Sequence, residues 1–184
     1  MTNPLTLEDV SRLFAEQGRL NYGEGVSQIE HALQCAERAE AAGGPDSLVV
    51  AALLHDIGHL VVREADVVAH LEDDRHEVTG AQMLKGLFGE EVRRPIAMHV
   101  AAKRWLCARE PGYFDALSQA SKESLRLQGG PFDDAAAAAF ERMPYFDAAV
   151  ALRRYDDEGK SLTPSRRTFA DFEPLMRQVA LITE

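Results

Sequence analysis

The stretch VAALLHDIGHL, Val50 to Leu60, builds an apolar helical face and then places ionisable side chains in it. Five apolar residues come first, His55 and Asp56 follow directly, and His59 lies four residues after His55. Buried ionisable groups are costly unless they are paired or bind a metal. The stretch therefore predicts a buried helix that ends in a metal site, with further ligands supplied from elsewhere in the chain.

Helical periodicity dominates the rest of the 184-residue chain, and strand alternation is nearly absent. We expect an all-α protein, an irregular helical bundle in which residues 1–184 form one domain. The expected helices run from Thr6 to Gly18, from Ser27 to Gly43, from Asp46 or Ser47 into HDIGH, and over residues 75–87, 90–108 (as one helix or two), 115–127, 133–142, 145–158 and 166–182, with residues 63–74 irregular.

The composition excludes several classes of partner. A formal net charge of −10 argues against a broad nucleic-acid surface and against binding to an anionic membrane. The N-terminal residues do not read as a signal peptide, and no apolar run approaches membrane-spanning length. Cys35 and Cys107 show no CxxC spacing, so we expect buried thiols and a cytoplasmic location.

Histidines and acids along the chain extend the candidate metal site. Any one of them alone is more often a core or surface residue than a ligand. As a set, neutral imidazoles with carboxylates suit iron, manganese or zinc, whereas a thiolate zinc site has no suitable spacing here. Adjacent His55 and Asp56 cannot share one helical face, but they can straddle two metals, with Asp56 bridging the ions. The candidate ligands are His31, His55, Asp56, His76, His99 and Asp156.

This order of ligands resembles the HD-domain superfamily, in which the full set is typical of dinuclear members. Most members are phosphohydrolases, so metal-dependent phosphohydrolysis is the alternative function. More of the chain resembles a narrower group, the phosphonate-degrading HD-domain oxygenases. The similar segments lie between about Leu20 and Lys160 and read GEGVSQIEHALQCA, AALLHDIGH, HVAAKRWL, SQASKESLRLQGGP and RRYDDEGK.

The resemblance implies an Fe(II)/Fe(III) pair that uses O2 to cleave the C–P bond of a 1-hydroxyphosphonate, giving a carboxylate and phosphate. The partners it implies are this small molecule and O2. The spacing agrees with the implied site, because Lys103 lies one helical turn after His99 and Arg153 one turn before Asp156. The positions that match the family's phosphonate contacts are His59, Lys103, Ser121, Ser124 and Arg153.

A loop near the N-terminus bears on the substrate. The resemblance assigns Tyr22 and Glu24 to an active-site loop, and we expect one of them to approach the metals before substrate binds. The substrates implied are 2-amino-1-hydroxyethylphosphonate, which gives glycine, and its trimethylammonium analogue, which gives glycine betaine. A quaternary ammonium needs aromatic faces and acidic charge. Tyr22, Tyr155, Trp105 and Glu24 are available, which favours the trimethylammonium substrate.

Overall fold

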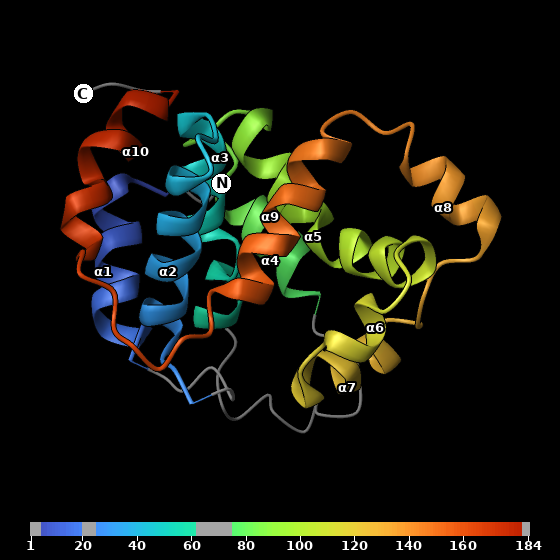
Figure 1. The fold of residues 1–184 in the computed structure, drawn as a ribbon. Helices are drawn as coiled ribbons and strands as arrows, with labels where there is room; N and C mark the ends of the chain where they lie inside the picture. The colour runs from blue at the N-terminus through green and yellow to red at the C-terminus, as the bar shows by residue number, and fades with distance from the viewer. Residues whose placement is uncertain (1–4, 20–24, 62–74, 182–184) are drawn as a thin grey trace.

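The computed structural model describes residues 5–19, 25–61 and 75–181, and their regular structure is helical (Figure 1). Within these ranges no strand forms, and isolated bridges pair Lys85 with Phe88 and Phe88 with Ala180. The all-α prediction is confirmed. The helices are α1 (Leu7–Gln17), α2 (Gln28–Ala41), α3 (Asp46–Leu54), the 3-10 turn η1 (Ile57–Leu60), α4 (His76–Met83), α5 (Glu90–Arg109), α6 (Tyr113–Ala116), α7 (Gln119–Leu127), α8 (Asp134–Phe140), α9 (Phe146–Glu158), the 3-10 turn η3 (Phe169–Phe172) and α10 (Glu173–Val179).

The bundle is organised around α3, α5 and α9. Helix α5 packs along α9, α2 packs against both α3 and α9, and α4 lies against α5 and η1. Every residue from Leu48 to Leu54 is buried, so α3 is apolar on all sides and forms the centre of the core. Helices α1 and α10 cover one end, and α6, α7 and α8 extend from the other (Figure 1).

Several predicted helix starts agree with the observed caps. Thr6 and Asp9 form a capping box at the start of α1, and the Ser27 side chain accepts a hydrogen bond from the Glu30 amide at the start of α2. Helix α5 is continuous, with Pro95 inside it. Among the residues placed in the structure, no helix has both the length and the apolar character needed to cross a membrane.

The central helix ends earlier than its sequence predicts. α3 stops at Leu54, His55 is its C-cap residue, and the chain then tightens into η1. A Cβ added at Gly58 would lie 2.1 Å from the backbone oxygen of His76. Only a glycine admits this close approach, which seats the start of α4 against η1. The prediction that the helix runs into HDIGH is therefore wrong at its end.

Two other predicted helices are divided. Residues 115–127 form α6 and α7, separated where the Ser118 side chain caps α7 by accepting from the Ser121 amide. Residues 166–182 form η3 and the shorter α10, with Thr168 and Asp171 making a capping box at the start of η3. In the first case a side-chain cap begins a new helix inside an apolar pattern that looks continuous in sequence. In the second case the cap lies at the start of η3, and α10 follows directly with Pro174 in its first turn.

Candidate metal centre

Six predicted ligands from five segments of the chain converge in the core. His31 comes from α2, His76 from the first position of α4 and His99 from the middle of α5. His55 and Asp56 follow α3, and Asp156 lies in the last turn of α9. All six are buried, with no more than 7% of any residue exposed. The structure thus brings the whole predicted set together.

The first half of the centre is formed by His31, His55 and Asp156. The Nε2 atoms of His31 and His55 lie 3.2 Å apart. Asp156 Oδ1 lies 3.4 Å from His31 Nε2 and 4.0 Å from His55 Nε2. Two imidazole nitrogens and a carboxylate oxygen therefore surround one small position.

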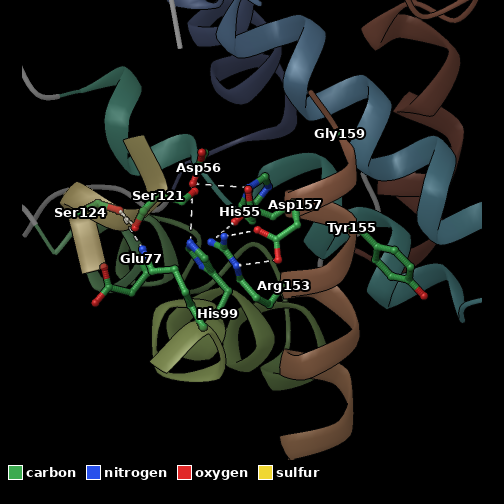
Figure 2. A network of polar contacts seen from close by, with 12 residues as sticks. His55, Asp56, Glu77, His99, Ser121, Ser124, Arg153, Tyr155, Asp157 and Gly159 are labelled. Atoms are coloured by element: carbon green, nitrogen blue, oxygen red, sulfur yellow. Dashed lines mark hydrogen bonds and ion pairs between the residues drawn. The ribbon is translucent and has the colours of Figure 1, made fainter. Parts of the chain in front are cut away.

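The second half is formed by His76, His99 and Asp56. The Nε2 atoms of the two histidines lie 3.3 Å apart, and Asp56 Oδ1 is 3.4 Å from the first and 3.7 Å from the second. The same Oδ1 lies 3.5 Å from His55 Nε2, while Oδ2 lies 3.8 Å from His31 Nε2. Figure 2 shows Asp56 joined to His55 and His99. Asp56 thus stands between the two halves, as a bridging carboxylate must.

Backbone carbonyls fix the ring orientation of three histidines. Nδ1 of His31 lies 2.7 Å from Gly159 O, Nδ1 of His55 lies 2.9 Å from Ala52 O, and Nδ1 of His99 lies 2.8 Å from Ile96 O. A carbonyl can only accept, so each Nδ1 carries the proton. In the neutral ring, Nε2 then presents a lone pair to the centre, which is the arrangement typical of metal-binding histidines.

The electrostatics favour neutral rings at His55 and His99 and an ionised bridge, whereas Cys35 and Asp156 outweigh burial and raise the pKa of His31 well above its ordinary value. Burial lowers the pKa of His55, and burial together with His55 and His76 holds the pKa of His99 well below its ordinary value. Burial alone would raise the pKa of Asp56, but the surrounding histidines outweigh it and lower that pKa. Asp56 Oδ2 is buried without a hydrogen-bond partner among the placed residues. Facing lone pairs and an unsatisfied carboxylate oxygen fit two divalent or trivalent cations.

Cys35 lies against His31 but has the character of a structural thiol. Its Sγ is 3.7 Å from His31 Nε2 and donates to the Tyr155 carbonyl at 3.4 Å. Burial raises the pKa of this thiol, which favours its protonated form. A Cβ at Gly159 would lie 2.4 Å from this sulfur, so glycine is also required where the chain passes over Cys35.

The predicted phosphonate contacts form two groups, one around Lys103 and one at the candidate ligand His76. In the first, the buried Lys103 ammonium donates to Ser124 Oγ at 2.9 Å, and Ser124 Oγ donates to the Ser121 carbonyl. Burial, with the nearby Arg153 guanidinium, lowers the pKa of Lys103 to about 8. In the second, His59 stacks on His76 with ring centroids 3.9 Å apart. Lys103 is close enough to Asp156 for that carboxylate to affect its pKa, and the His59 ring is in contact with the candidate ligand His76.

Arg153 has two carboxylate partners on its own helix and a tyrosine partner from a distant one. Its guanidinium donates to Asp156 Oδ2 at 2.6 Å and to Asp157, and its Nε donates to the Tyr113 hydroxyl at 3.1 Å. Tyr113 in turn donates to Asp157. These contacts raise the pKa of Arg153 and outweigh burial to hold that of Asp156 well below its ordinary range. Arg153 therefore orients Asp156, one of the candidate metal ligands.

The sequence does not predict the supporting residues Asp157 and Tyr113. Asp157 directly follows a candidate ligand, which was the available signal, but Tyr113 lies forty residues from Arg153 and only folding brings them together. Tyr22 and Glu24 lie outside the described residues, and their expected approach to the metals stays a prediction.

We expect Arg153→Ala to weaken metal binding at the half that contains Asp156. The loss should be about ten- to a hundredfold in affinity, because outer partners of metal ligands typically contribute that much. Titrating metal into the metal-free variant and the parent measures it. Arg154→Ala is the matched control, because the exposed Arg154 pairs with Glu110 instead. Equal metal affinity in the Arg153 variant and the parent would contradict the orienting role.

Comparison with known proteins agrees with this geometry. The sequence profile of the family described as HD domain matches residues 29–136. The chain is 47% identical over 150 residues to a protein of Gimesia maris named hydroxymethylphosphonate dioxygenase, covering 80% of this chain and 75% of that protein. It is 39% identical over 175 residues to a protein of Leisingera caerulea named 1-hydroxy-2-(trimethylamino)ethylphosphonate dioxygenase (glycine-betaine-forming), covering 94% and 89%.

Proposed function

We propose that this chain, which belongs to the HD-domain family, is an oxygenase that uses O2 to cleave the C–P bond of a 1-hydroxyphosphonate. The matches confirm the resemblance inferred from the sequence, and the two named relatives are both phosphonate dioxygenases. The observation that carries the proposal is Asp56, whose carboxylate stands between two groups of histidine lone pairs. The two free thiols support a cytoplasmic location as part of the proposal.

The cofactor that we propose is a pair of iron ions. His31, His55 and Asp156 would hold one ion, His76 and His99 the other, and Asp56 both. Nitrogen and carboxylate donors without thiolate suit iron that must change its oxidation state. When bound, the iron pair supplies the activation of O2 and the oxidation of the hydroxyl-bearing carbon. The protein positions the substrate beside it and keeps the site buried.

The buried cations Lys103 and Arg153 form the proposed binding site for the phosphonate group of the substrate. We propose that Lys103 donates to a phosphonate oxygen, with Ser121, Ser124 and His59 completing the oxygen contacts. Arg153 is also proposed as a phosphonate contact, through the guanidinium hydrogens that its two aspartates leave. Charge-assisted hydrogen bonds of this kind fix both position and orientation. Holding the phosphonate here directs the neighbouring carbon to the metals.

The rings of Tyr155 and Trp105 are directed away from this site. Tyr155 points away from the network in Figure 2. Trp105 packs edge-on against Phe146, with 4.9 Å between ring centroids, and donates to Glu141 on the surface. We therefore do not assign these two rings to a trimethylammonium group in our proposal. Recognition of the substrate's other end is left to Tyr22 and Glu24 in our proposal.

The test is phosphate release with and without O2 from three substrates. The candidates are hydroxymethylphosphonate, 2-amino-1-hydroxyethylphosphonate and the trimethylammonium analogue, and the expected carbon products are formate, glycine and glycine betaine. In each reaction one oxygen atom of O2 enters the carboxylate and the other enters phosphate, which balances the atoms. We expect phosphate only in the presence of O2, with one of the three turned over fastest. Equal release without O2 would overturn the proposal in favour of a phosphohydrolase.

We expect Lys103→Met to raise the dissociation constant of the preferred phosphonate by about ten- to a hundredfold, with metal content unchanged. The pH dependence should also change. Arg153, Lys160, Asp156 and Asp157 surround the ammonium, whose pKa of about 8 means that it is charged below that pH. Because a bound anion raises this pKa, the parent's advantage over the variant should shrink as pH rises above about 8.

Calorimetric titration of the phosphonate without O2, between about pH 6.5 and 9.5, gives the dissociation constants of the parent and of Lys103→Met. The quantity compared is the ratio of these two constants at each pH. Using the ratio removes the titration of the phosphonate itself, which affects both proteins equally. A ratio that is constant across this range, or close to one throughout, would contradict the role given to Lys103.

A further inference from the structure

Lys160 brings a second ammonium group to the serines of α7. It lies just after α9, four residues beyond Asp156, and its Nζ donates to Ser121 Oγ at 3.2 Å. Lys103 reaches Ser124 on the same helix from α5. The two hydroxyls are one helical turn apart, so two lysines from different elements converge on one face of α7.

The cations near this face of α7 differ in whether a carboxylate lies beside them. The Arg153 guanidinium already faces Asp156 and Asp157, so its charge is compensated inside the protein. Lys103 is 3% exposed and has no carboxylate within ion-pair distance in the part of the chain that the structure describes. Lys160 is near enough to contribute to the lowered pKa of Lys103. Two neighbouring ammonium groups in a half-buried site favour a bound anion between them.

The hydroxyl of Ser121 is also oriented to donate a hydrogen bond to a bound anion. Its oxygen accepts from Lys160, which leaves its own proton to be donated. Ser121 is buried, and the Ser118 side chain fixes its backbone amide at the start of α7. A tetrahedral anion at this position can receive hydrogen bonds from ammonium and hydroxyl together.

We infer that Lys160 is a further anion-binding residue of this site, donating to an oxygen of a phosphonate or phosphate group beside Lys103. The inference rests on the proposed function for the location of the anion, and it deepens that function by adding a second ammonium group to the contacts of the anion. Lys103 and Lys160 approach neighbouring hydroxyls of α7 from two different elements, while the Arg153 guanidinium is engaged by Asp156 and Asp157.

The experiment titrates inorganic phosphate into the metal-loaded protein without substrate or O2. Phosphate tests the anion site whether the reaction is an oxygenation or a hydrolysis. The variants are Lys160→Ala and Lys160→Arg. Lys122→Ala is the matched control, because Lys122 lies on the same helix but donates to the Asp115 carbonyl. Metal content and the thermal unfolding midpoint verify that each variant is intact.

We expect Lys160→Ala to raise the phosphate dissociation constant about tenfold or more, with Lys160→Arg restoring most of the affinity and Lys122→Ala unchanged. The KM for the phosphonate should rise by a similar factor while kcat changes less. Unchanged phosphate affinity in Lys160→Ala overturns the inference. The proposed function fails by a different result, phosphate release from phosphonates that does not need O2.

Discussion

Asp56→Ala is expected to remove both metal ions and reduce phosphate release to background. The carboxylate is the ligand that both halves of the centre share, since Oδ1 lies near His55, His76 and His99 and Oδ2 faces His31. Without it, the half formed by His76 and His99 keeps two imidazoles and no carboxylate. The other half keeps two imidazoles and the carboxylate of Asp156. The measurement is metal content per chain after loading with iron.

Asp46→Ala is the matched control for this variant. Asp46 is an exposed aspartate at the opposite end of α3, where it accepts from Gln178. Circular dichroism should show that both variants remain helical. Retention of one tightly bound ion by Asp56→Ala would refute the bridging role, because an ion held without Asp56 needs no shared ligand.

Gly58→Ala is expected to damage both stability and metal binding. The new Cβ would lie 2.1 Å from the His76 backbone oxygen and 2.8 Å from its carbonyl carbon, and backbone atoms cannot rotate away as a flexible side chain can. The start of α4 must therefore move, taking His76 with it. Overpacking of this kind costs about 1–3 kcal/mol or more, and metal affinity at the half that contains His76 should fall at least tenfold.

The measurements are the free energy of unfolding in denaturant and metal content per chain. Gly89→Ala provides the comparison, because a Cβ there meets only the Glu91 side chain, which can rotate away. If Gly58→Ala binds two ions as tightly as the parent and unfolds at the same denaturant concentration, the close contact between η1 and α4 does not position the ligand.

The ligands could be predicted from sequence because each interrupts a local pattern. His55 and Asp56 follow a run of residues that is buried throughout, and His99 is surrounded by apolar residues on α5. A polar group in such a place requires a partner, and the chemistry of the set then indicates a metal. The helices followed from the same periodicity, which is why the fold class and most helix starts agree with the structure.

The supporting contacts could not be predicted, because they join residues that are distant in sequence. Nothing near Arg153 reveals that Tyr113 will meet its guanidinium, and Lys160 gives no sign that it will reach Ser121. The early end of α3 depends on how closely α4 approaches Gly58. Such features are set by tertiary packing, which overrides local propensity.

The distribution of the ligands along the chain couples metal binding to folding. His31 and Asp156 belong to one half of the centre but come from α2 and α9, so a bound ion acts as a non-covalent cross-link between early and late segments. An unfolded chain cannot present these ligands together, and an ion therefore binds the native state selectively. By thermodynamic linkage, free metal at a hundred times its dissociation constant adds about 2.7 kcal/mol to the free energy of unfolding. With the proposed ions bound, the centre therefore also stabilises the folded bundle, and removal of the metal is expected to lower the free energy of unfolding.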